Sequence, residues 1–275
     1  MQSLYETISV VLITYGHEKF IEECINGVLM QNCTFSIDLI IANDCSPDKT
    51  HEIIGSIINN HPRGSWIRYF KHEKNIGMMP NFLFGLNAAK GKYVALCEGD
   101  DFWTDPMKLQ KQIDFMESHQ NFSMCFHAVE IERASETDFY EYPIPPLDVL
   151  FLRDVIRTHY VPTCSLVFRN SYFPLGYPSW FTKSISGDIP LEILVASKGE
   201  IKYFEQKMAC YRRNLGSITH DKDHISRIRP GYIYMYSKIA HEIQGGSKIY
   251  LYGKVLKLRL GYIKDFLRKL GLIKK

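Results

Sequence analysis

The first hundred residues alternate short apolar runs with segments whose apolar residues recur at helical spacing. The apolar runs are Ile8 to Thr14, Asp38 to Asn43, Ile67 to Phe70 and Tyr93 to Cys97. Each has the length of a strand and is rich in β-branched residues, without the polar alternation of a half-exposed strand. Strands buried on both faces are typical of parallel sheets covered by helices on both sides, so the sequence predicts an α/β fold.

Helical patterns fill the gaps between these runs. One of them begins at Pro80, a residue suited to the first helical turn, and ends near Gly91, a residue suited to follow a helix. After the last run, the pattern from Thr104 to Pro106 predicts the start of a helix that continues to about Ser118. Further along, Pro-rich loops such as Tyr142 to Leu147 leave the order of the elements open.

The charge of the chain is unevenly distributed. The whole chain of 275 residues carries +3, which argues against a dedicated nucleic-acid-binding protein. From Lys248 onward there are nine basic residues and one acidic residue, so this tail carries +8 and leaves about −5 for the rest. We therefore expect one domain over residues 1–220 and a basic, mainly helical extension over residues 221–275. Apolar residues alternate with the basic ones, which predicts either contact of 248–275 with an anionic membrane surface or packing on the domain.

The seven cysteines include no Cys-x-x-Cys pair, and an odd number cannot form a closed set of intramolecular disulfides. Reduced thiols are typical of cytosolic proteins, and no signal peptide or apolar run of about 18 residues is evident. The expected location is the cytoplasm, with peripheral contact at the inner face of the cell membrane. The cysteines and histidines also lack the ligand spacing of a zinc site.

Polar residues follow three of the four apolar runs. Thr14 and Tyr15 close the first, Asn43 to Ser46 the second and Glu98 to Asp101 the fourth. Ligands of open parallel sheets bind at the carboxyl ends of the strands. Three carboxylates within four residues repel one another unless a cation compensates them, and Mg²⁺ or Mn²⁺ bound with a diphosphate is one solution. The alternative is an acidic turn ahead of the next helix.

The sequence resembles the family 2 glycosyltransferases of the GT-A fold over about Ile8 to Arg213. The segments that carry the resemblance, in order, are ISVVLITYGHEKFIEECINGVLMQ, DLIIANDCSPDKT, NIGMMPNFLFGLNAAKGKYVALCEGDDFW and the block from Ser186 to Arg213. The resemblance implies a GT-A-like, mostly parallel sheet flanked by helices.

The same resemblance assigns residues to the nucleotide and the metal. It implies nucleotide contacts from Thr14, Tyr15, Glu18, Asp44 on the base and Glu98 on the ribose, and Mn²⁺ or Mg²⁺ binding by Asp100 or Asp101. Asp100 then lies beside both nucleotide and metal. The chain has Glu98 where the family more often has Asp. Because of this difference, the resemblance does not extend to metal binding by Glu98. Asp44 has an alternative role as the acceptor of a turn over Ser46 to Asp48.

Asp188 is the candidate general base for the acceptor hydroxyl, since the family places its catalytic carboxylate in a similar setting. The alternative is a helix cap, because Asp is favoured ahead of a first turn that contains Pro. Tyr211 to Arg213 is a candidate diphosphate contact, with a surface position as the alternative. His127 is either an acceptor contact or a structural histidine.

The resemblance implies transfer of a sugar, with inversion, from a nucleotide diphosphate donor to a hydroxyl of a saccharide or lipid-linked saccharide. UDP is the commonest nucleotide of the family, and a role in bacterial surface polysaccharide synthesis is implied in the same way. One alternative is a sugar-nucleotide nucleotidyltransferase, which usually has a Gly-rich basic loop where this chain has Thr14 to Glu18. The other is an inactive nucleotide-sugar-binding protein, which would be expected to lack one of the carboxylates.

Overall fold

The structure, a computed structural model, describes residues 7–133, 135, 138–213 and 224–269. Its centre is an eight-stranded sheet in the order β3-β2-β1-β4-β9-β6-β10-β8. The strands are β1 (Ile8–Thr14), β2 (Ile37–Asn43), β3 (Ile67–Lys71), β4 (Tyr93–Glu98), β6 (Phe122–His127), β8 (Val149–Leu150), β9 (Val167–Arg169) and β10 (Glu200–Phe204).

Six strands of this sheet run in one direction. The strands β3, β2, β1 and β4 are parallel neighbours, and β6 and β10 form a second parallel pair. The short strand β9 lies antiparallel between β4 and β6, and β8 is antiparallel at one edge. The predicted α/β class with a mostly parallel sheet is therefore confirmed.

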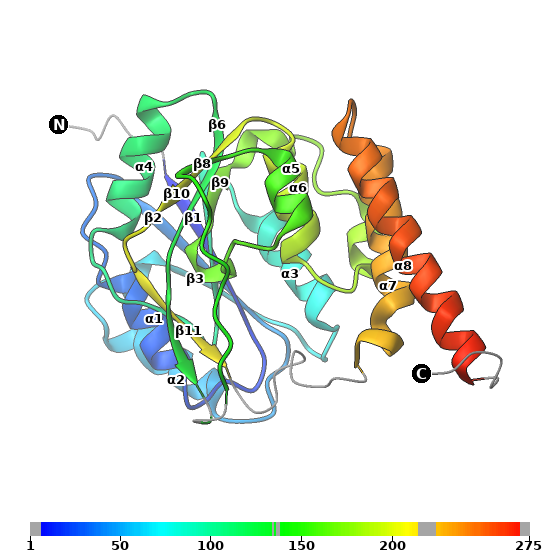
Figure 1. Cartoon of the computed structure of the whole chain (residues 1–275). Helices are drawn as coiled ribbons and strands as arrows, with labels where there is room; N and C mark the ends of the chain where they lie inside the picture. Colours follow the sequence, from blue (N-terminus) through cyan, green and yellow to red (C-terminus); the bar gives the residue numbers. More distant parts are fainter. Residues whose placement is uncertain (1–6, 134, 136–137, 214–223, 270–275) are drawn as a thin grey trace.

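Helices cover both faces of the sheet (Figure 1). One face packs against α1 (Ile21–Leu29), α2 (Thr50–Asn60) and α4 (Lys108–Ser118), and the other against α3 (Met78–Ala88), α5 (Leu152–Arg157) and α6 (Asp188–Ala196). Neighbouring residues of β1 supply both cores, with Val10 in the first and Val11 in the second. This division explains why the strands are apolar throughout, because side chains of a strand point alternately to the two faces.

Shorter elements complete the domain. A second sheet has the order β5-β11-β7 and is formed by β5 (Phe102–Trp103), β11 (Ala209–Arg213) and β7 (Glu130–Arg133). Single 3₁₀ turns occupy Gly64–Trp66, Thr163–Ser165, Asn170–Tyr172 and Ser179–Lys183. Pro80 lies in the first turn of α3, where a helix leaves N–H groups unpaired, but the helix begins at Met78 and ends at Ala88 rather than running from Pro80 to near Gly91.

The C-terminal helices α7 (His224–Glu242) and α8 (Ser247–Lys269) form an outer layer beside α5 and α6 (Figure 1). Buried residues of both helices, among them Met235 and Leu251, belong to the core on the α3, α5 and α6 side of the sheet. Lys254 Nζ donates to the carbonyl oxygen of Ile156 at 2.6 Å, which ties α8 to α5. The expected helices are therefore present, while the proposed domain boundary at 220/221 lies outside the described residues.

The outward side of α8 exposes large apolar side chains next to basic ones. Its exposed large side chains are Ile249, Tyr250, Tyr252, Leu256, Leu260, Tyr262, Ile263 and Phe266. None of the helices in the described part of the chain combines the length and apolarity that a membrane crossing requires.

Candidate active site

The carboxyl ends of β1, β2 and β4 lie side by side, because β1 pairs with both other strands. Thr14 at the end of β1 is opposite Asn43, and Ile13 is opposite Glu98. The Thr14 side chain is buried, whereas Tyr15 immediately after it is 48% exposed. The sheet therefore brings the polar ends of all three strands to one edge, as the sequence predicts.

Asp44, the residue after β2, accepts hydrogen bonds from the segment that leads into α3. Its Oδ1 accepts a hydrogen bond from the N–H of Ile76 at 2.7 Å, and its Oδ2 accepts one from the N–H of Gly77 at 2.9 Å. The N–H of Ser46 donates instead to Asn43 Oδ1 at 2.9 Å, so the alternative of Asp44 as the acceptor of that turn is wrong. The contact between Asp44 and a nucleotide base stays a prediction.

Glu18 joins the loop after β1 to the loop after β2. The N–H of Glu18 donates to Asp48 Oδ2 at 3.0 Å, and the Glu18 carboxylate accepts from the N–H of Lys49 at 3.1 Å. These hydrogen bonds join the two loops at the edge of the sheet. Tyr15, in the loop after β1, is exposed there.

Gly99 allows the turn after β4 to pack against the end of β1. A Cβ atom at this position would lie 2.6 Å from His17 Nδ1 and 2.8 Å from Thr14 Oγ1, closer than side-chain contacts allow. Burial lowers the pKa of His17, and the neighbouring charge of Asp100 opposes that change. The close packing holds the segment from Glu98 to Asp101, called the acidic turn below, against Thr14 and His17.

The carboxyl groups of Glu98 and Asp101 in the acidic turn are shielded from solvent. Burial, followed by the charges of Asp101 and Asp100, raises the pKa of Glu98 well above its ordinary value. Burial and the charge of Asp100 likewise raise the pKa of Asp101. Asp101 Oδ1 accepts from the N–H of Arg212 at 2.8 Å, while its buried Oδ2 has no hydrogen-bond partner among the described residues. An oxygen-rich cluster with such an unsatisfied atom suits a hard divalent cation.

The Arg212 guanidinium is buried rather than directed to solvent. It forms ion pairs with Glu23 and Glu132, donates to the carbonyl oxygen of Asp100 at 3.1 Å and lies 4.3 Å from the ring centroid of Phe102. These contacts anchor β11 beneath the acidic turn, so the surface position considered for this arginine is wrong.

Asp188 is the first residue of α6 and accepts a hydrogen bond from the first turn of this helix. The N-cap is Gly187, and no side chain forms a cap hydrogen bond there. Asp188 Oδ1 instead accepts bonds from the hydroxyl of Ser186 and from the N–H of Ile189, the latter at 2.8 Å. A Cβ atom at Gly187 would lie 2.6 Å from the ring of Phe82, so the glycine lets the start of α6 pack against α3.

His159, in the loop after α5, lies between two carboxylates of α6. Its Nε2 is 3.6 Å from Asp188 Oδ2, and its Nδ1 is 3.2 Å from Glu192 Oε2. Sequence reasoning missed His159, which belongs to no motif or periodic pattern. The spacing of Asp188 and Glu192 is the one sequence signal here, since residues four apart share a helix face.

The three side chains form a charged cluster. Burial alone would lower the pKa of His159, but Glu192 and then Asp188 raise it to about 9. Burial raises the pKa of Glu192, and the positive charge of His159 opposes that change. The possible metal-binding atoms of the three residues lie within 4.8 Å of one another. However, the imidazole presents a different nitrogen to each carboxylate, which favours two ion pairs over one metal centre.

Asp188 and the acidic turn share one electrostatic environment. The negative charge of Asp188 contributes to the raised pKa of Glu98. The pKa of Glu98 therefore responds to a carboxylate that lies about 90 residues further along the chain.

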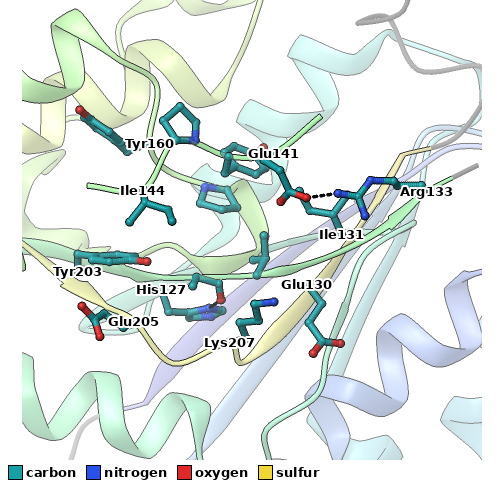
Figure 2. Close-up of a pocket in the computed structure, with 15 residues that line it drawn as sticks. His127, Glu130, Ile131, Arg133, Glu141, Ile144, Tyr160, Tyr203, Glu205 and Lys207 are labelled. Atoms are coloured by element: carbon teal, nitrogen blue, oxygen red, sulfur yellow. Dashed lines mark hydrogen bonds and ion pairs between the residues drawn. The ribbon is translucent and has the colours of Figure 1, made fainter. Parts of the chain in front are cut away.

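A cavity of about 640 Å³ adjoins the cluster at the carboxyl ends of β6 and β10. Figure 2 shows His127, Tyr203, Glu205 and Lys207 along one side and Ile144 and Tyr160 along the other. Tyr142 also lines the cavity, and its ring centroid is 6.1 Å from that of His159.

His127 lies at the end of β6, as expected, and is fully buried. Its Nδ1 is 2.8 Å from the carbonyl oxygen of Ala128, and burial lowers its pKa well below the ordinary value. The buried Nε2 of His127 has no hydrogen-bond partner among the described residues, so both an acceptor contact and a structural role stay open.

Known proteins with similar structures share this architecture. S. aureus TarS residues 1–349, solved in complex with UDP, matches with a TM-score of 0.70 and 16% identity, over 98% of this chain and 75% of that chain. A mannosyltransferase from Pyrobaculum calidifontis, solved with GDP-Man and Mn²⁺, matches with a TM-score of 0.64 and 14% identity, over 92% of this chain and 70% of that chain. At such low identity these similarities establish the fold.

Sequence relatives and a family model identify the family. An uncharacterized protein of Mycobacterium tuberculosis is 35% identical over 224 residues, which is 78% of this chain. The chain spans 60% of the length of that relative. The model described as glycosyl transferase family 2 matches residues 9–173, and this range contains β1 except for Ile8, β2 to β4 and the acidic turn. The chain therefore belongs to glycosyl transferase family 2.

Proposed function

We propose that the chain transfers a sugar from a nucleotide diphosphate donor to an acceptor hydroxyl with inversion at the anomeric carbon. One observation carries this proposal: Tyr142 packs against both His159, which pairs with Asp188, and Tyr211, and the next residue of β11, Arg212, donates its N–H to Asp101 of the acidic turn. A diphosphate site and a general base must be close together for a single displacement, because the two bonds form and break at one carbon atom.

The donor lies across the carboxyl ends of β1, β2 and β4 in this proposal. The nucleotide contacts Thr14, Tyr15 and Glu18, with Asp44 near the base and Glu98 near the ribose. The support is their arrangement, since the two loops after β1 and β2 are hydrogen-bonded to each other and border the acidic turn. The S. aureus structure in complex with UDP favours a UDP-sugar as donor.

Asp100 and Asp101 are the proposed ligands of Mn²⁺ or Mg²⁺. Asp101 offers a buried oxygen without a partner among the described residues, and Asp100 is the more accessible of the two. When bound, the ion would offset negative charge on the departing diphosphate. The Mn²⁺ complex of the archaeal mannosyltransferase supports this choice of ion.

Asp188 acts as the general base. The acceptor oxygen forms a bond to the anomeric carbon while its proton passes to the Asp188 carboxylate. The bond from the anomeric carbon to the diphosphate oxygen breaks on the opposite face, and its electron pair leaves with the nucleoside diphosphate. One displacement of this kind inverts the anomeric configuration.

The acceptor is proposed to be a saccharide or a lipid-linked saccharide, in the synthesis of a bacterial surface polysaccharide. The outward face of α8 supports a position at an anionic membrane, since its exposed apolar residues lie among the exposed cations Lys257, Arg259 and Lys264. Inward residues of the same helix pack on the domain, so the two uses of the tail expected from the sequence are compatible.

A panel of UDP-, GDP- and dTDP-sugars tests the proposed function. Purified protein is incubated with each donor and simple saccharide acceptors, with Mn²⁺ or with EDTA, and the released nucleoside diphosphate and any glycoside are measured. We expect one donor class to be consumed in Mn²⁺ only. Release of pyrophosphate from a nucleoside triphosphate and a sugar phosphate would indicate a nucleotidyltransferase, and binding of a donor without turnover would indicate an inactive binding protein.

A further inference from the structure

We infer that His159 is a positioning residue of the transfer reaction, which holds the Asp188 carboxylate in place through simultaneous ion pairs to Asp188 and Glu192. This inference rests on the proposed function, because Asp188 is the base of that reaction. His159 itself need not touch either substrate.

The geometry of the ring supports a bridging role. The two ring nitrogens face different carboxylates, at 3.6 Å for Asp188 Oδ2 and 3.2 Å for Glu192 Oε2. An imidazole attracts carboxylates on both sides only when the ring is protonated and carries a positive charge. The protonated ring therefore fits this place between two acidic groups.

Glu192 is the buried partner of His159, which forms a bridge of two ion pairs between Glu192 and Asp188. Its side chain is only 2% exposed, and Oε1 has no hydrogen-bond partner among the described residues. A buried carboxylate without a compensating cation is costly, so Glu192 holds His159 tightly. Asp188 is the accessible end, with 30% of its side chain exposed where an acceptor can approach.

The two oxygens of Asp188 have different supports. Oδ1 accepts bonds from the Ser186 hydroxyl and the Ile189 N–H within the first turn of α6. Oδ2 faces His159, which comes from the loop after α5. Contacts from two separate elements fix the orientation of the carboxylate, and small displacements of a reacting group are expensive in rate.

Groups from the surrounding elements modify the charge of this cluster. Lys254 of α8 lowers the pKa of His159, against the larger opposite effect of Glu192 and Asp188. Tyr142 contacts the ring from the 141–144 segment, and Tyr236 of α7 lies within the field of both carboxylates. Since the pKa of His159 is about 9, the ring is a cation at neutral pH.

The experiment combines NMR titration with kinetics on the 275-residue chain. Histidine imidazole signals are titrated between pH 5 and 10.5 in the wild type, His159→Gln, Glu192→Gln and Asp188→Asn. We expect one signal that titrates near pH 9, is absent from His159→Gln and moves to lower pH in the other two variants. Absence of any histidine titrating clearly above pH 6.5 would overturn the bridge without reference to catalysis.

Kinetics test whether the bridge serves the reaction. With the donor found in the panel above, we expect His159→Gln to reduce kcat by about 10- to 100-fold with an unchanged donor KM. The alkaline decline of wild-type kcat near pH 9 should disappear in His159→Gln and move to lower pH in Glu192→Gln. His159→Lys, which restores a cation, should recover part of kcat.

Two controls separate positioning from stability. The double variant His159→Gln/Glu192→Gln removes both charges, so it should unfold closer to the wild-type temperature than His159→Gln while kcat stays low. His119→Gln changes an exposed histidine elsewhere and should leave kcat and the pH profile unchanged. Wild-type kcat in well-folded His159→Gln would overturn the inference and leave the proposed function intact. A wild type that neither binds nor consumes any nucleotide sugar would overturn both.

Discussion

The amino-terminal third of the molecule, residues 8–103, builds its part of the site differently from the region that begins at His159. In the first region, each candidate residue lies at the end of a parallel strand or in the loop that follows it, and neighbouring strands bring these ends together. In the second, His159 comes from a loop and its carboxylate partners from α6. Backbone pairing positions the proposed donor site, whereas side-chain ion pairs position the proposed base.

The two regions should respond differently to single substitutions. A side chain at a strand end keeps its place when its neighbour changes, because the sheet ladder holds the backbone. A side chain held by an ion pair moves or changes its protonation when the partner is removed. The second region should therefore respond more strongly to single changes than the first.

The largest expected effect belongs to Asp188→Asn. The amide has nearly the same size as the carboxylate but cannot accept the acceptor proton, so we expect kcat to fall by about 10²- to 10⁴-fold. Binding of UDP with Mn²⁺, measured by calorimetry, should stay close to that of the wild type. Asp154→Asn is the matched control, since Asp154 accepts a hydrogen bond from the N–H of Phe151 at a helix start and has no proposed chemical role. Near-wild-type turnover of Asp188→Asn would move the search for the base to Asp101, Glu192 or His127.

Asp100→Ala is the corresponding change in the first region. We expect the affinity for UDP in Mn²⁺ to fall by about 10- to 100-fold, and the affinity in EDTA to be low already in the wild type. The double variant Asp100→Ala/Asp101→Ala should lose nucleotide binding, although Asp101 also holds the N–H of Arg212. Calorimetry that gives equal wild-type affinities in Mn²⁺ and in EDTA would refute the assignment of a metal to this turn.

The outward face of α8 should bind anionic vesicles. Leu256, Leu260 and Ile263 are more than half exposed at helical spacing, and we expect their joint replacement by Glu to weaken co-sedimentation with phosphatidylglycerol vesicles. The expected loss is at least about tenfold, because each added negative charge near the surface costs on the order of 1 kcal/mol. Leu147→Glu/Leu175→Glu, at exposed loop positions, is the control and should bind like the wild type. Equal binding by the α8 variant would exclude this face as the membrane contact.

The smallest expected effect is the dependence of stability on the protonation of His159. The pKa of this residue in the folded chain is about 9, above its ordinary 6.5, so protonated His159 stabilises the fold. The contribution is fully present below pH 6.5 and is lost as the pH rises through about 9. Allowing for its partial exposure, we expect about 1–2 kcal/mol in the free energy of unfolding. Urea denaturation of the wild type and His159→Gln over this range measures the effect, and a pH-independent difference would contradict the ion pairs.

The sequence by itself determined the fold class and one edge of the site. Strands such as Ile8–Thr14 are apolar on both faces, which requires helices on both sides of a sheet, and residues at their ends must share an edge. The bounds of β1 follow from its run of apolar residues, and Pro and Gly indicate the approximate extents of α3 and α4, because such patterns express contacts between residues close in the chain.

Only the tertiary structure decided the rest. Strand β9 has three residues, too few for a periodic signal, and its place between β4 and β6 depends on pairing across the sheet. The buried contacts of Arg212 likewise join segments more than 75 residues apart. His159 meets Asp188 and Glu192 because the loop after α5 passes over the start of α6, and no local spacing in the sequence encodes that meeting. Interactions between distant segments depend on how the whole chain packs, so they become visible only in the folded molecule.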